Sequence, residues 1–300
     1  MLEFFQHLVN GISLGSIYAL IALGYTMVFG ILQLINFAHG DVYMLGAFIG
    51  MYTSRYLHLA DDPSLSHLIL AMAVSMVGTA CIGFLIEKFA YRPLRKSPRI
   101  NVLITAVGVS LLLEFGGQLL FGADPKFFPQ IYTPTGDWSV AGLKINPLQI
   151  VVLLIALVLM VVLQTIIYKT RLGRAMRAVS FNHDLASLMG IPTDRVISYT
   201  FMLGSSLAGA AGVLVGLIYP KVEPLMGVMP GLKCFVAAVL GGIGNVSGAV
   251  LGALTLGLGE EFVVGYWAPT YRDALAFALL ILVLLFKPTG LLGTGKTEKV

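Results

Sequence analysis

Residues 148–168 read LQIVVLLIALVLMVVLQTIIY, an apolar run that contains no charged side chain. About 20 consecutive apolar residues are enough for a helix to cross the hydrocarbon core of a bilayer. This stretch therefore predicts a membrane-spanning helix, and similar stretches recur along most of the chain.

The composition of the whole chain supports the same interpretation. Hydrophobic residues make up 57% of the 300 positions and charged residues only 11%, against about 25% charged residues in an ordinary globular domain. A soluble fold of this size lacks the polar side chains to cover its surface, which excludes a soluble enzyme, a nucleic-acid-binding protein and a disordered chain. The net charge of +4 comes from short basic blocks between apolar stretches, a pattern typical of cytoplasmic loops.

Seven stretches have the composition of membrane spans. They are Leu8–Phe29, Val42–Leu57, Leu68–Phe89, Val102–Phe121, Leu148–Tyr168, Val196–Tyr219 and Ala274–Phe286. The short alternating strands of an outer-membrane barrel are absent from the sequence. We therefore expect an all-α fold, a polytopic transmembrane helical bundle that forms a single domain over residues 1–300.

The basic residues predict how the bundle is oriented. They gather in three connections: Lys88, Arg92, Arg95, Lys96 and Arg99; Lys169, Arg171, Arg174 and Arg177; Lys287, Lys296 and Lys299. By the positive-inside rule all three connections face the cytoplasm. Three spans precede the first of them, so we expect the N-terminus outside and the C-terminus inside.

A glycine-rich apolar region, Leu232–Val264, interrupts this simple pattern. Between the second and the third basic connection, which both face the cytoplasm, the chain must cross the membrane an even number of times. Val196–Tyr219 and Ala274–Phe286 account for two crossings, so this region must contribute either no crossing or two. With about 33 residues it is too long for one untilted span, and at its centre residues 241–248 read GGIGNVSG, a poor helix interior. We predict a re-entrant hairpin of two half-helices. Irregular backbone at membrane depth has to be packed in protein or to line a water-filled cavity, so this hairpin should border a pathway.

A second interruption, residues 30–41, reads GILQLINFAHGD. Paired broken helices point to inverted repeats in transporters, although the two interruptions share few residues and an internal repeat stays open. The polar side chains at the breaks have two possible roles: they line the passage, or they cap the broken helices. The candidate pathway residues are Asn36, His39, Gly40, Asp41, Glu114, Gly241, Gly242, Gly244 and Asn245.

Other intramembrane residues leave alternatives open. Glu114 either lines a cavity or pairs with a neighbour such as Lys233, and Glu260 and Glu261 are expected at the membrane interface. Small residues recur at four-residue spacing, which indicates close helix contact. They are Gly11, Gly15 and Ala19 on one span and Gly204, Ala208, Gly212 and Gly216 on another. Packing within the chain is favoured over a sliding surface or a contact with a second subunit.

The second basic connection contains a short amphipathic segment. Asn182 is a good N-cap, Gly190 can take the left-handed conformation after a helix, and between them Leu185, Leu188 and Met189 form one apolar stripe. The segment either lies on the inner membrane surface or inserts into a cytoplasmic partner. The candidate coupling residues are Arg174, Arg177, Asn182, Leu185, Leu188, Met189 and Gly190.

No catalytic motif is present in the sequence. The glycine-rich run fails as a phosphate-binding loop, because that motif needs a lysine after its last glycine and Gly248 is followed by Ala249. The two cysteines, Cys81 and Cys234, lack the spacing of a metal site. Energy for active transport would have to come from another protein.

The chain resembles the LivH/LivM-type permeases of bacterial branched-chain amino acid ABC importers. The resemblance is carried by Asn10-Gly11, Ser16–Val28, Ile35–Gly40, Gly173–Ala178, Leu188–Ile191, Gly241–Gly252 and Lys287–Leu291. It implies transport of leucine, isoleucine and valine across the inner membrane. It also implies four further components: a LivM-like second permease, two ABC ATPases that hold ATP and Mg²⁺, and a periplasmic binding protein. This chain itself would bind no cofactor and no nucleic acid.

The resemblance also implies that residues 182–190 take the place of the coupling helix, within a cytoplasmic segment of about 170–195. The EAA–Gly consensus of other ABC permeases is absent, which leaves the limits of that helix undefined. Two other classes of function compete. An ion-driven transporter would use Glu114 and Asp41 as ion sites. A membrane-embedded enzyme would need His39, Asp41 and Glu114 at one depth, whereas the expected topology places Glu114 nearer the outside and His39 near the inner end.

Overall fold

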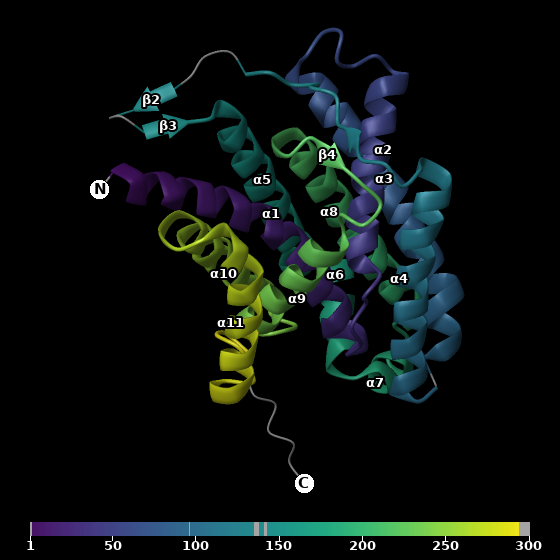
Figure 1. Cartoon of the computed structure of the whole chain (residues 1–300). Helices are drawn as coiled ribbons and strands as arrows, with labels where there is room; N and C mark the ends of the chain where they lie inside the picture. Colours follow the sequence, from purple (N-terminus) through teal and green to yellow (C-terminus); the bar gives the residue numbers. More distant parts are fainter. Residues whose placement is uncertain (1, 96, 135–137, 141–142, 294–300) are drawn as a thin grey trace.

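The computed structural model describes residues 2–95, 97–134, 138–140 and 143–293, and most of these residues belong to helices (Figure 1). The helices are α1 (Leu2–Leu32), α2 (His39–Tyr56), α3 (Leu65–Ile86), α4 (Arg99–Phe121), α5 (Pro147–Lys169), α6 (Arg171–Phe181), α7 (His183–Leu188), α8 (Thr193–Ile218), α9 (Val228–Gly241), α10 (Val246–Tyr266) and α11 (Arg272–Phe286). The expected all-α transmembrane bundle is confirmed.

Short elements complete the fold. A π-helical turn, η1 (Glu87–Tyr91), and a 3₁₀ turn, η2 (Arg92–Leu94), follow α3, and η3 (Pro269–Tyr271) precedes α11. Strand β1 (Lys126–Phe127) pairs with β4 (Lys221–Val222), and β2 (Trp138–Val140) pairs with β3 (Leu143–Ile145), both antiparallel.

The bundle has two distinct ends (Figure 1). The strands lie at one end, which we call the strand end. Helix α7 and the end of α11 lie at the opposite end, which we call the α7 end. Arg92 of the first basic connection contacts Asp194 at the start of α8, and the second connection includes α6 and leads into α7. The described parts of the first two basic connections therefore lie together at the α7 end, as the sequence predicts; Lys96, Lys296 and Lys299 lie outside the described residues.

Among the described residues, seven helices are long and apolar enough to cross a membrane: α1, α3 with its two following turns, α4, α5, α8, α10 and α11 with η3. The predicted span Val42–Leu57 is the exception. It coincides with α2, an 18-residue helix that begins with His39 and Asp41 and is buried along most of its length. Helix α2 lies inside the bundle, where neighbouring helices rather than lipid surround its polar groups.

The glycine-rich region 232–264 differs from the expected pair of half-helices. Helix α9, with 14 residues, is a half-helix, but α10 extends over 21 residues and is long enough to span the membrane. The turn between them lies at the α7 end, because the N–H of Leu292 donates to the carbonyl of Gly241. Gly242 and Gly244 have φ angles of +104° and +91°, which L-residues rarely adopt. The glycines therefore form a tight turn at the end of the bundle between a half-helix and a helix of spanning length.

The helix breaks inside the bundle lie at the starts of α2 and α9. The buried first turn of α2 packs against the start of α9, and a Cβ added at Gly40 would lie 2.5 Å from the carbonyl oxygen of Gly227. Both helices therefore begin between other helices, and two irregular segments, residues 33–38 and 223–227, lead into them. These two breaks are the ones that meet.

Small residues allow the helices to approach closely within this chain. A Cβ added at Gly257 would lie 2.5 Å from Cα of Gly15, and one added at Gly46 would lie 2.5 Å from Cα of Gly209. Contacts of this kind join α1 to α10 and α2 to α8. Gly15, Gly204 and Gly212 of the predicted small-residue stripes also lie against backbone of this chain.

Gly46→Ala is expected to destabilise the protein by about 1–3 kcal/mol, because the added methyl group meets backbone that cannot rotate away. Thermal unfolding of the purified protein in detergent measures this change. Gly108→Ala on α4 is the matched control, since a Cβ there meets nothing within 4 Å and alanine favours a helix. Equal stability of the two variants would contradict the close contact between α2 and α8.

Candidate functional site at the α7 end

Helix α7 is defined by strong caps at both ends. The Asn182 side chain accepts a hydrogen bond of 2.9 Å from the N–H of Leu185, which is the geometry of an N-cap. Gly190 has a φ of +79°, and the N–H of Ile191 donates to the carbonyl of Ala186 at 3.0 Å. Together with the bond from Gly190 to Ser187, this is a Schellman motif. The predicted positions of both caps are confirmed.

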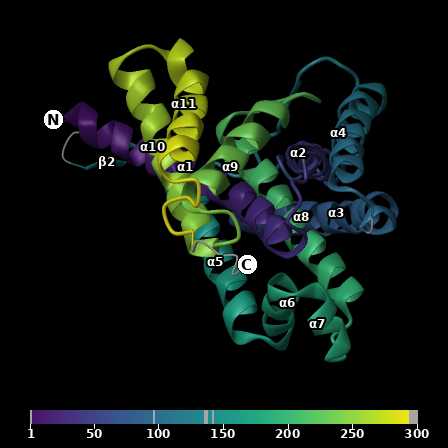
Figure 2. The same ribbon diagram turned by 90° about the horizontal axis from the view of Figure 1, so that it is seen from below.

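The predicted apolar stripe faces away from the protein. The exposed fractions of Leu188 and Met189 are 82% and 83%, and Leu185 is also exposed, whereas Ala186 is buried. In the view from below, α6 and α7 lie at the edge of the bundle (Figure 2). Phe181, at the end of α6, was not among the predicted residues, and its side chain is 80% exposed. Its position directly before an N-cap was the available signal.

Helix α6 connects this surface to the membrane part. The Thr170 hydroxyl accepts from the N–H of Gly173 at 3.1 Å, and a Cβ at Gly173 would lie 2.1 Å from the carbonyl oxygen of Ile167, so only glycine fits this corner. The Arg177 guanidinium donates to the same Ile167 carbonyl and thereby caps α5. Arg177 thus holds the corner between α5 and α6, while Arg174 is exposed.

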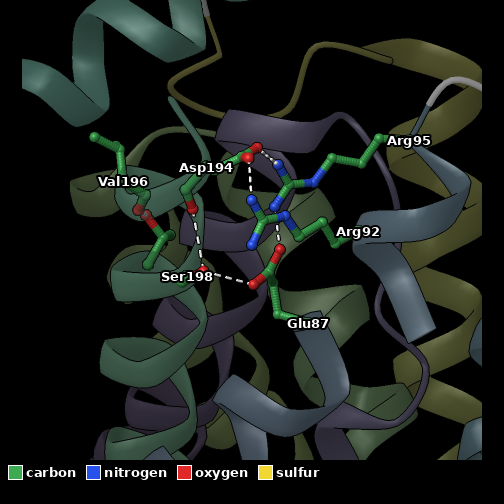
Figure 3. Close-up of polar contacts among 7 residues, drawn as sticks. Glu87, Arg92, Arg95, Asp194, Val196 and Ser198 are labelled. Atoms are coloured by element: carbon green, nitrogen blue, oxygen red, sulfur yellow. Dashed lines mark hydrogen bonds and ion pairs between the residues drawn. The ribbon is translucent and has the colours of Figure 1, made fainter. Parts of the chain in front are cut away.

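A network of ion pairs fixes the start of α8, directly after α7 (Figure 3). Glu87 of η1 is fully buried and pairs with Arg95, and Arg95 also pairs with Asp194 at 2.6 Å. Arg92 donates to Asp194, and the Ser198 hydroxyl donates to Glu87 at 2.5 Å. The network joins the end of α3 to the first turn of α8. Sequence analysis counted Arg92 and Arg95 only as topology signals.

The residues of the first helix break are buried and have partners. The Tyr91 hydroxyl donates to Asn36 Oδ1 at 2.8 Å. His39 Nε2 lies 3.2 Å from the carbonyl oxygen of Ile21, so this nitrogen carries the proton. Neither side chain caps a helix in the way expected. They attach the break to α1 and η1 instead.

Asp41 and Glu114 come together through Ser110, a residue that sequence analysis missed. The Ser110 hydroxyl donates to Asp41 Oδ2 at 2.5 Å and lies 3.4 Å from Glu114 Oε1. Asp41 is buried, whereas Ser110 and Glu114 are half-buried. Asp41, two residues after His39, therefore lies close to Glu114, although His39 was expected at a different depth from Glu114. The reason is that α2 begins inside the bundle.

Lys233 does not pair with Glu114. Its ammonium group lies 3.0 Å from Glu260 Oε1 and 2.6 Å from Asp273 Oδ1. Glu260 also accepts from Arg272 at 2.7 Å. Glu260 is 0% exposed. It belongs to a buried charge cluster between α9, α10 and α11.

Asn245 has the capping role proposed for the helix-break residues. Its Oδ1 accepts from the N–H of Gly248 at 3.1 Å, and its Nδ2 donates to the carbonyl of Leu292 at 2.9 Å. With Gly241, Gly242 and Gly244 it builds the turn at the α7 end. Gly244 of this turn lies beside Gly30 in the last turn of α1, where an added Cβ would lie 3.5 Å from Cα of Gly244.

The chain is similar in sequence to known permease proteins. The sequence matches the family described as branched-chain amino acid transport system / permease component over residues 7–284. It is 42% identical to the permease protein BraD of Pseudomonas aeruginosa, covering 99% of this chain and 98% of that protein. It is also 42% identical to LivH of Escherichia coli K12, covering 100% and 98%.

More distant relatives include a second type of permease. The chain is 25% identical to LivM of Salmonella typhimurium, covering 92% of this chain and 68% of that protein. No solved structure matches the chain. The similar proteins are permease proteins of a transport system, and seven apolar helices are present among the described residues. The chain belongs to the family of permease components of branched-chain amino acid transport systems and is a multi-pass membrane protein.

Proposed function

We propose that this chain is one of two permease subunits of an ATP-driven importer that carries leucine, isoleucine and valine across the bacterial inner membrane. Full-length identity above 40% to BraD and LivH supports the substrate class. The observation that carries the mechanism is the exposed apolar stripe of α7, which is capped at both ends. An apolar surface of this kind, directed away from its own protein, is typical of a docking site.

The partners follow from the same proposal. A LivM-like permease shares the passage, two ABC ATPases bind ATP and Mg²⁺, and a periplasmic binding protein delivers the amino acid. The α7 stripe inserts into a cleft on one ATPase. ATP-driven closure of the ATPases then moves α7, and the two permeases alternate access to the passage. This chain binds no cofactor of its own.

Among the predicted pathway residues, Glu114 is the one whose position best suits contact with solute. It is half-buried on α4, a helix with many exposed apolar side chains. A carboxylate in this position can accept hydrogen bonds from the ammonium group of an amino acid. Asn36 and His39 are buried and bonded within the chain, so we assign them to holding the helix break. The binding protein selects the solute, which allows the passage itself to be apolar.

Reconstitution in liposomes tests the transport function. The complete complex is expected to take up leucine only with ATP and the binding protein. The contact between Asp41, Ser110 and Glu114 is the feature that an ion-driven transporter would use. Uptake by this chain alone under a proton or sodium gradient would therefore overturn the proposal in favour of that alternative.

We propose that the α7 end faces the cytoplasm and that the N-terminus is periplasmic. The gathering of the basic connections at the α7 end supports this orientation. In a background with Cys81 and Cys234 replaced by alanine, Leu2→Cys is expected to react with an impermeant thiol reagent only from outside. Met189→Cys should react only from inside, since both side chains are exposed. Labelling with the opposite sidedness would invert the topology and remove α7 from the ATPase side.

A further inference from the structure

A groove of about 600 Å³ lies at the α7 end, between the end of α3 and the start of α8. One wall consists of Phe84, Lys88 and Arg92, and the other consists mainly of α8 side chains from Asp194 to Met202. The turn after α7 closes the groove at its outer end. Arg92 and Asp194 also belong to the ion-pair network in Figure 3, so the groove lies directly beside that network.

Polarity changes along the groove in the same direction on both walls. Phe84 lies within α3 and Met202 within α8, so the inner part is apolar and at membrane depth. Lys88 and Arg195 lie nearer the α7 end, where the helices leave the membrane. An apolar inner part with a basic mouth at the interface matches the two parts of a phospholipid.

The charges of the groove do not cancel. Glu87 and Asp194 pair with Arg92 and Arg95. Lys88 and Arg195 have no carboxylate partner among the residues that the structure describes. The Lys88 ammonium lies 5.6 Å from the ring centroids of both Phe84 and Phe89, which holds it beside the apolar wall. Two positive charges are thus left to meet an anion.

We propose that this groove binds one anionic phospholipid, with its phosphate at Lys88 and Arg195 and an acyl chain along Phe84 and Met202. A free phosphate ion would make no use of the apolar wall. A segment of a partner protein would have to present an acidic group and an apolar face in the same order. The bound lipid would contact η1 and the start of α8 at the same time, and would therefore bridge the two elements that position α7. This proposal is independent of the transported solute.

Native mass spectrometry of the full-length chain, purified with its accompanying subunits, tests the proposal. The protein is titrated with phosphatidylglycerol and, separately, with phosphatidylcholine that has the same acyl chains. We expect one phosphatidylglycerol to be retained in preference to phosphatidylcholine. Lys88→Gln with Arg195→Gln should weaken its binding roughly 30-fold, from about 1 kcal/mol for each basic residue. Lys169→Gln with Arg171→Gln makes the same charge change at the same end and should leave this binding unchanged.

Two further outcomes decide the occupant. A photoreactive amino acid in place of Tyr199, which lines the groove, is expected to gain the mass of one phospholipid on irradiation in native membranes. A covalent adduct with a protein subunit would overturn the proposal and assign the groove to a subunit contact. Equal retention of both lipids, or equal losses in both double variants, would overturn it as well.

Discussion

Leu188→Asp is expected to abolish substrate-stimulated ATP hydrolysis while leaving the permease folded. Leu188 is largely exposed on α7, so an aspartate there costs the isolated chain little. In the proposed docked state the same side chain is buried in an ATPase cleft, where an unpaired carboxylate costs several kcal/mol. We therefore expect a loss of about 100-fold or more in stimulated hydrolysis, since each 1.4 kcal/mol is a factor of ten.

The measurement is ATP hydrolysis by the reconstituted complex with binding protein and leucine. Leu292→Asp is the matched control, because Leu292 is an exposed leucine at the α7 end outside α7. It should retain both co-purification with the ATPases and stimulation. Unchanged stimulation in Leu188→Asp would remove the coupling role from α7. A loss of similar size in Leu292→Asp would show that the effect is not specific to the stripe.

Glu260→Gln is expected to give the largest loss of stability among single substitutions in this chain. Glu260 is fully buried and contacts Lys233, Arg272 and the Tyr18 hydroxyl. Removing its charge leaves the buried Lys233 with Asp273 alone and takes the carboxylate partner from the half-buried Arg272. Breaking a buried ion pair in this way costs about 3–5 kcal/mol. The corresponding fall in the unfolding midpoint is roughly 10 °C.

Thermal unfolding in detergent measures this effect, and the neighbouring residue supplies the control. Glu261 lies in a more accessible position near His7 and Asn10, so Glu261→Gln should cost less than about 1 kcal/mol. The double variant Glu260→Leu with Lys233→Leu should recover part of the stability, because an apolar pair replaces the ion pair. Additive losses in the double variant would contradict the assigned pairing.

Local signals in the sequence were sufficient to predict six of the seven candidate spans and the caps of α7. An N-cap at Asn182 and a left-handed residue at Gly190 depend on neighbours within one turn, so residue type alone identifies them. Apolar length likewise marked helices such as α5 without reference to the rest of the fold.

Contacts between distant segments could not be predicted in the same way. Lys233 had several acidic residues as possible partners, and only the rotation and depth of each helix select Glu260 and Asp273. The position of the glycine-rich turn could not be predicted either. The glycines predicted a helix break within residues 241–248, but counting membrane crossings allowed the region to contribute either no crossing or two. The position of the turn at the end of the bundle depends on its contact with Leu292.

The network of ion pairs between the end of α3 and the start of α8 affects how movement of α7 is transmitted. Its ion pairs hold the first turn of α8 against the end of α3, and further along α8 the backbone of Gly209 lies against Gly46 of α2. Displacement of α7 therefore cannot be absorbed by bending where α8 enters the bilayer. We expect α3, α8 and α2 to rotate as one rigid unit. A displacement of α7 at the membrane surface would then rotate the buried start of α2 in the middle of the membrane.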